Sequence, residues 1–280
     1  MNTVEQTLGS VTQLTILDRT DSGILLDGRD MGRIFLQRQG TQDGPLVGES
    51  IQVFVYTDSN GVPTATIQTP LATVGECAFL QVVDVSAVGA FLDWGLPKDL
   101  FVPFREQKTP MTVGHSYIVK IYLDTRSNRI AASTRLDKLI ADTTNNLSAG
   151  EKVNLLFSNR TSLGWKAVVN NDVWGMLHST DIFRTIKSGM QTTGFIKTLR
   201  DDGKIDLSLE QPGYGKVTQV CKAILSTLKE NRGSIPVTDH SPPHVIREWF
   251  GVSKKTYKKA LGALYKERRV VLSRDEVSLS

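Results

Sequence analysis

Hydrophobic and polar positions alternate in short runs that recur as a unit along most of the chain. One unit, residues 51–68, has two alternating runs around a polar turn, and a second copy, residues 117–134, begins sixty-six positions later. A weaker third copy occupies residues 192–211. In each copy a Gly turn precedes the first run, and alternation around a polar turn predicts a β-hairpin.

Each predicted hairpin follows another pair of apolar runs, at residues 22–36, 88–103 and 163–178. In every pair a Gly precedes the first run, and a short polar or Gly-containing turn separates the two. Five short strands in about 65 residues suit a small Greek-key barrel, because a single exposed sheet of that size is only marginally stable. The pattern predicts three tandem OB-type barrels, at residues 1–70, 71–145 and 146–213.

The hydrophobic period changes from two to that of a helix near Val217. Apolar residues up to Leu228 fall at i, i+3, i+4 and i+7 spacing, which predicts an amphipathic helix. A short helix fits residues 243–250, a third opens at the N-cap Ser253, and the last residues form two short strands. This is the order of a winged helix, so the expected fold is mainly β and multidomain: three tandem OB-fold barrels followed by an α+β winged-helix domain at residues 214–280.

The third predicted helix separates apolar from basic residues. Tyr257 and Leu261 fall on one side at 100° per residue, and most of the lysines fall on the other, with Gly262 among them. A Gly on the solvated face of a helix costs about 1 kcal/mol against Ala, and lysines in the first turn oppose the helix dipole. Neither the Gly nor the first-turn lysines stabilise the helix, so their presence supports a binding role for this face.

Composition and charge narrow the class of protein. The chain has 280 residues, with 40% apolar and 22% charged residues, which is typical of folded globular domains. From Tyr214 onward there are 13 Lys and Arg against 6 Asp and Glu, whereas the preceding residues carry 20 against 23. The basic excess lies in the C-terminal quarter, where a polyanion would concentrate, although a solvated basic face gives the same count.

Several other classes lack a signal in the sequence. No stretch is apolar enough to span a membrane and the N-terminus does not have the build of a signal peptide, so we expect a cytoplasmic protein without a membrane partner. Cys77 and Cys221 are far apart, which favours core packing over zinc or a disulfide. No nucleotide-binding, zinc-protease or GxSxG motif occurs, so we expect neither an enzyme nor a cofactor.

Two stretches resemble a known family. Residues 75–136 resemble an S1-motif RNA-binding domain, with VSAVGAFLDWG as its Gly-aromatic second strand and LFVPFRE as its third. Residues 174–179 match the third strand better, and residues 23–36 keep only the skeleton. Residues 241–266 are similar to the C-terminal signature of the conserved virulence factor B (CvfB/YitL) family, whose members have successive S1-like domains and a winged helix. The resemblance implies single-stranded RNA as a partner and a role in post-transcriptional regulation.

In S1-type domains, aromatic residues of the second strand and a His on the third form the platform that stacks on bases. The second copy has Val88 and Pro103 where an aromatic and the His are expected, and the first copy has Leu25 and Leu36 at the matching places, so the first barrel is expected to be degenerate. The candidate nucleic-acid-binding residues are Phe91, Trp94, Trp165, Lys166, Trp174 and His178 in the barrels, with Lys254, Lys255, Lys258, Lys259, Lys266, Arg268 and Arg269 in the third helix.

Three alternatives remain open at this level. Each aromatic ring can instead be buried in a barrel core, which is the commoner place for a ring in a β-barrel. The winged helix can belong to a DNA-binding transcription regulator, although its lysines suit phosphates better than base edges. It can also be a protein-docking module, with partners that the sequence does not identify.

Overall fold

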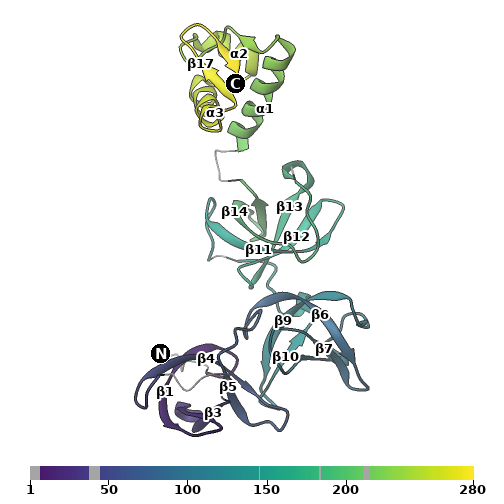
Figure 1. Cartoon of the computed structure of the whole chain (residues 1–280). Helices are drawn as coiled ribbons and strands as arrows, with labels where there is room; N and C mark the ends of the chain where they lie inside the picture. The colour runs from purple at the N-terminus through teal and green to yellow at the C-terminus, as the bar shows by residue number, and fades with distance from the viewer. Residues whose placement is uncertain (1–6, 38–44, 145, 183, 211–214) are drawn as a thin grey trace. The chain divides into compact units, whose positions relative to one another are not determined.

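The computed structural model describes residues 7–37, 45–144, 146–182, 184–210 and 215–280. Figure 1 shows β-strands from the N-terminus through the teal segment, and the α-helices in the green and yellow C-terminal segment. The fold class is mainly β, with S1-like barrels followed by a winged helix, as the alternation of the sequence predicts.

The first and third strand groups are closed barrels with the same strand order. The first contains β1 (Val11–Arg19), β2 (Gly23–Asp27), β3 (Arg33–Gln37), β4 (Ser50–Thr57) and β5 (Pro63–Thr66). The third contains β11 (Lys152–Arg160), β12 (Gly164–Val169), β13 (Val173–His178), β14 (Gln191–Leu199) and β15 (Ile205–Ser208). Each barrel closes through one parallel pair, β3 with β5 and β13 with β15. Small closed barrels of this order leave no unpaired sheet edge.

The second strand group has the same sequence of strands but a different closure. It contains β6 (Cys77–Val85), β7 (Gly89–Leu92), β8 (Leu100–Pro103), β9 (Ser116–Asp124) and β10 (Arg129–Ser133). They form a five-stranded sheet in the order β10-β9-β6-β7-β8, and no β8–β10 ladder joins its ends within the described residues. The three predicted barrels are therefore two closed barrels and, in this group, a half-barrel.

A bulge bends the first strand of each group at the same place. The pairing register shifts between Ile16 and Asp18 in the first group and between Val82 and Asp84 in the second. The third has its shift between Phe157 and Arg160. An extra residue at a bulge increases the local twist, which lets a short strand wrap around a small core.

The C-terminal segment is a winged helix with a core of its own. Its elements are α1 (Gly215–Glu230), β16 (Ser234–Ile235), α2 (Pro243–Phe250), α3 (Lys254–Lys266), β17 (Val270–Leu272) and β18 (Val277–Leu279). Ser253 caps α3, because its side chain accepts a hydrogen bond of 3.3 Å from the backbone N–H of Thr256. Residues from all three helices, among them Ile224, Ile246 and Tyr257, are fully buried together.

The cysteines are packing residues. Cys77 is buried and Cys221 is half-buried, and burial raises the pKa of the Cys77 thiol to about 11. In the part of the chain that the structure describes, no helix has the length and apolar character needed to cross a membrane. The same residues contain no cluster of His, Cys, Asp and Glu side chains suited to a metal ion.

Candidate nucleic-acid interface

Strand pairing places equivalent residues side by side in the three strand groups. The Gly that opens the second strand pairs with Gln37, Pro103 or His178 on the third strand. Two residues further along, the cross-strand pairs are Leu25 with Phe35, Phe91 with Phe101, and Lys166 with Met176. We call these three pairs the platform positions, because the S1 resemblance implies base-stacking residues on the second strand and these pairs include them.

The second group has an aromatic pair at its platform position. The ring centroids of Phe91 and Phe101 lie 5.2 Å apart at an interplanar angle of 37°, and both side chains are half-buried. A Cβ at Gly89 would stand 2.7 Å from Cε2 of Phe101 and 2.3 Å from the carbonyl oxygen of Val102. Gly89 therefore makes room for the Phe101 ring over the strand. The sequence identified Phe91 but not Phe101. Alternation along a strand shows which residues share a face, but only the pairing register shows that the face of Phe101 points outward.

The first group has one exposed ring at the same place. The Phe35 side chain is 36% exposed, and a Cβ at Gly23 would lie 2.5 Å from its ring. Leu36, one residue further along, is instead buried. The first barrel was expected to be degenerate because it offers Leu25 and Leu36, but the outward residue of β3 is Phe35.

The third group holds an ionic cluster beside its platform position. Nε2 of His178 lies 2.9 Å from Oδ1 of Asp206, and the Arg200 guanidinium makes hydrogen bonds of 2.6–3.1 Å to the same carboxylate. Nη2 of Arg200 is also 3.0 Å from Nε2 of His178. Burial alone would raise the pKa of Asp206, but the hydrogen bonds and charges of Arg200 and His178 together hold that pKa below its usual value.

Sequence reasoning identified His178 but missed Arg200 and Asp206. Asp206 reaches the site because the parallel β13–β15 pair sets it opposite Met176, and Arg200 follows β14 in the intervening hairpin. Acidic residues at a hairpin are ordinary turn chemistry in the sequence, so only the tertiary pairing singles out Asp206.

Trp174 was expected to be a stacking ring, and the structure corrects this. Its side chain is only 6% exposed and packs in a cluster with Leu136, Ile140 and Val168. Its indole nitrogen, Nε1, has no hydrogen-bond partner among the described residues. Trp174 lies on the outer face of β13, but the apolar residues that precede the barrel cover it, so it is a packing residue in this structure.

Two other third-barrel candidates keep partly accessible side chains. Trp165 is half-buried, and its ring meets Phe157 edge-on with centroids 6.2 Å apart. The Lys166 ammonium lies 3.9 Å from the centroid of the Trp174 ring, a cation–π contact, and 3.8 Å from a carboxylate oxygen of Asp137. Lys166 is therefore a cation held in place at the edge of this face.

Trp94 was also a candidate, and it is a core residue. The side chain is 2% exposed, and its ring meets Phe54 edge-on with centroids 5.6 Å apart. Its indole N–H donates to the carbonyl oxygen of Lys98 at 2.6 Å. The Trp94 ring is thus buried in the protein, and its indole N–H is satisfied there.

The basic candidates of the winged helix lie on α3 and just after it. The Lys254 ammonium donates to the carbonyl oxygen of His240 at 3.3 Å, and the Lys258 ammonium lies 3.4 Å from a carboxylate oxygen of Asp239. Arg269 lies 3.8 Å from Glu267. The exposed members of the set are Lys255, Lys258, Lys259, Lys266, Arg268 and Arg269. All of these cations reach solvent, whereas the apolar face of α3 is buried.

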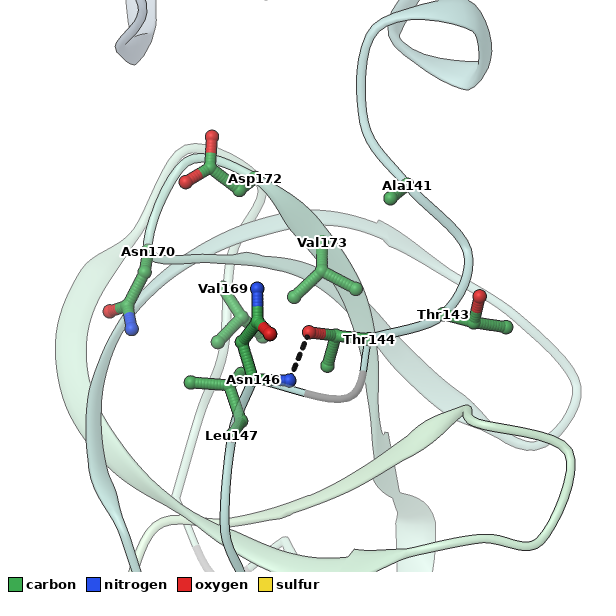
Figure 2. Close-up of a pocket in the computed structure, with 9 residues that line it drawn as sticks. All are labelled: Ala141, Thr143, Thr144, Asn146, Leu147, Val169, Asn170, Asp172 and Val173. Carbon is green, nitrogen blue, oxygen red and sulfur yellow. Dashed lines mark hydrogen bonds between the residues drawn. The ribbon is translucent and has the colours of Figure 1, made fainter. Parts of the chain in front are cut away.

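The hollow in Figure 2 does not suit a polyanion. It has a volume of about 540 Å³ beside the β12–β13 turn, and Asp172 is the one charged residue among the described residues that line it. The backbone N–H of Asn146 donates to Oγ1 of Thr144 at 3.1 Å, so part of its polar lining is already satisfied. A lone carboxylate repels phosphate groups, so the platform positions and α3 are better candidates for a nucleic-acid interface than this hollow.

S1-like barrels followed by a winged helix define a multidomain protein of nucleic-acid-binding type. A family model described as "S1 domain" matches residues 8–68, and one described as "CvfB-like winged helix domain" matches residues 222–279. The family resemblance inferred from the sequence is thereby confirmed: the chain is similar to the conserved virulence factor B proteins. The matched models describe binding domains and no enzyme family.

Relatives are similar over nearly the whole chain. YitL of Bacillus subtilis (strain 168) is 27% identical over 94% of this chain and 90% of its own length. Conserved virulence factor B of Staphylococcus saprophyticus is 23% identical over 98% of this chain and 94% of its own length. A crystal structure of a multidomain protein with nucleic acid binding domains from Streptococcus pneumoniae TIGR4 is 22% identical over 99% of both chains, with a TM-score of 0.42.

Proposed function

We propose that this protein binds single-stranded RNA and regulates gene expression at the RNA level in the cytoplasm. The observation that carries the proposal is the Phe91–Phe101 pair, two half-buried rings on adjacent strands at an S1-type platform position. Rings in this arrangement stack on unpaired bases, whereas duplex bases are already stacked on each other. Phe35 and the His178–Arg200 cluster provide further contacts at corresponding places on the other barrels.

The winged helix supports the same function through charge. Its exposed lysines neutralise phosphates without reading bases, so it adds affinity for any strand and little sequence preference. The names of the relatives agree with a regulatory role, and the choice of RNA over DNA depends on the stacking platform.

The test is a titration of the full chain with single-stranded RNA, duplex RNA and duplex DNA at two salt concentrations. Single-stranded RNA should bind most tightly, and Phe101→Ala should weaken that binding roughly ten- to a hundredfold, since stacking contributes about 1–3 kcal/mol per base. The matched control is Phe101→Leu, which keeps apolar cover over Gly89 but removes the π-face and should bind as weakly as Phe101→Ala. Tighter binding to duplex DNA would contradict the proposal and favour a DNA-binding regulator.

A further inference from the structure

The lysines of α3 divide into two rows that differ in their contacts. Lys254 and Lys258 are one helical turn apart, and each contacts the 239–240 segment before α2. Lys255, Lys259 and Lys266 make no ion pair or hydrogen bond through their ammonium groups with any residue that the structure describes. The first row therefore helps to hold α3 against its neighbour, and the second is directed to something outside the protein.

Gly262 completes the second row. Positions 255, 259, 262 and 266 follow one another at i, i+4, i+7 and i+11, so they form a single line along the solvent side of α3. The line rises about 6 Å between the first two positions and about 16 Å over its length. A glycine thus stands inside a row of cations, with lysines on both sides of it.

The fold gives no reason for a glycine at position 262. A Cβ built there would have no atom within 4 Å, so no neighbouring element needs the space. The residue lies in the interior of a regular helix, where Gly is the least favourable residue after Pro. By contrast, Gly89 and Gly164 have backbone atoms within 2.3 Å of such a Cβ and are required by packing. The protein keeps a bare stretch of helix backbone where its own packing would accept a side chain.

We propose that Lys255, Lys259, Gly262 and Lys266 form a phosphate-contact row, on which the sugar-phosphate backbone of an RNA strand lies directly against the α3 backbone at Gly262. The lysines neutralise phosphates on either side, and the missing Cβ lets the strand come within contact distance of the helix. The row contains no apolar side chain, whereas protein-docking surfaces have an apolar centre. This inference rests on the proposed RNA-binding function and adds the backbone-contact residues to it.

The decisive variant is Gly262→Leu in the full chain, with Gly262→Ala beside it. Both should raise the melting temperature of the winged helix, by about 4–8 °C for Ala, because they improve helix propensity without meeting a neighbour. Both variants should also bind single-stranded RNA less tightly than wild type. The larger loss should occur in Gly262→Leu, whose affinity should fall roughly tenfold or more. A raised melting temperature together with a lowered RNA affinity would show that the added side chain occupies space that the RNA needs. A folding defect would lower both the melting temperature and the affinity.

Two adjacent lysines provide the matched control. Lys259→Gln should weaken RNA binding and reduce the slope of log affinity against log salt by about 0.7, the contribution of one phosphate on a single strand. Lys258→Gln removes the same charge from a lysine that already pairs with Asp239, so it should reduce the slope by less than Lys259→Gln does. Equal effects of the two variants would contradict the phosphate-contact row, since the loss of one positive charge would then explain both results wherever the lysine lies.

The outcomes separate this inference from the proposed function. If the wild-type chain binds no RNA at low salt, the proposed function fails and the row has no RNA ligand. If it binds RNA, and Gly262→Leu and Lys259→Gln bind as tightly as wild type, the proposed function stands and the phosphate-contact row is wrong. In that case RNA does not lie along Gly262, and any contact of the winged helix with RNA is made by its other cations.

Discussion

At the scale of single residues, the position of a ring in the strand does not decide whether it can bind. Phe91 and Trp174 both lie on outward faces of barrel strands, yet Phe91 remains half-exposed and Trp174 is covered by Leu136 and Ile140. The covering residues come from outside the strands that hold the ring. A large aromatic side chain that is buried away from solvent contributes mainly to the stability of the fold.

We therefore predict that Trp174→Ala lowers the free energy of unfolding by about 3–5 kcal/mol, the usual loss for a large aromatic residue replaced in a core. Binding of RNA by the folded fraction should change little. Trp174→Phe is the matched control, because it keeps most of the apolar contact and removes the indole N–H that has no partner. Thermal melting and RNA titration of both variants are the measurements, and lost binding at unchanged melting temperature would restore Trp174 to the interface.

Asp206 gives a prediction in pH. Its pKa is below the usual value in the folded chain, so its contribution to stability is present above the unfolded pKa of about 3.9 and is lost as the pH falls through the folded pKa. The difference in melting temperature between wild type and Asp206→Asn should be largest above about pH 5 and should shrink toward pH 3. A difference that is constant across this range would show that Arg200 and His178 do not depend on the charge of Asp206.

At the scale of elements, the β12–β13 turn shows how two residues set a register. Asn170 and Asn171 have φ values of 47° and 69°, so both central residues of the turn are left-handed, and the backbone N–H of Asp172 closes the turn on the carbonyl oxygen of Val169 at 3.0 Å. Oδ1 of Asn170 also accepts a hydrogen bond of 2.8 Å from the backbone N–H of Asn154. This turn fixes which residues of β12 and β13 face outward, and with them the Lys166–Met176 platform position.

Asn170→Ala should therefore destabilise the third barrel by about 1–2 kcal/mol, because Ala disfavours the left-handed region and cannot accept the hydrogen bond. Asn170→Gly loses only the hydrogen bond and should destabilise it less. Chemical denaturation followed by Trp fluorescence measures the difference. A larger loss for Gly than for Ala would mean that backbone conformation is not what Asn170 supplies.

The elements themselves could be predicted well from the sequence, because each barrel strand buries one face and alternates in consequence. The contacts between elements could not. Phe35 and Phe101 became platform residues only once the strand register was known, and Asp206 joined His178 through a parallel pairing of strands distant in the chain. Whether a barrel closes could not be predicted either, since nothing in the alternation distinguishes a paired edge from an unpaired one.

At the scale of the whole molecule, the winged helix has an apolar core of its own. All buried residues of its core lie between Val217 and Val277. A segment of this size with a closed apolar core can fold alone, as small domains of about 60 residues do. In our proposal, the barrels and the winged helix carry two binding surfaces that hold the same strand.

Covalent linkage then predicts more affinity than either surface has alone. Once one surface holds a strand, the other meets it at an effective concentration set by the connecting chain, and the combined affinity can exceed that of the stronger part by about 10² to 10⁴. We expect fragments 1–210 and 215–280 each to bind a long single-stranded RNA weakly, and the full chain to bind it far more tightly. Mixing the two fragments should not restore the affinity, because the linkage is lost. A short RNA that reaches only one surface should bind the full chain no better than the stronger fragment, and fragments that together match the full chain on long RNA would show that the two surfaces act without coupling.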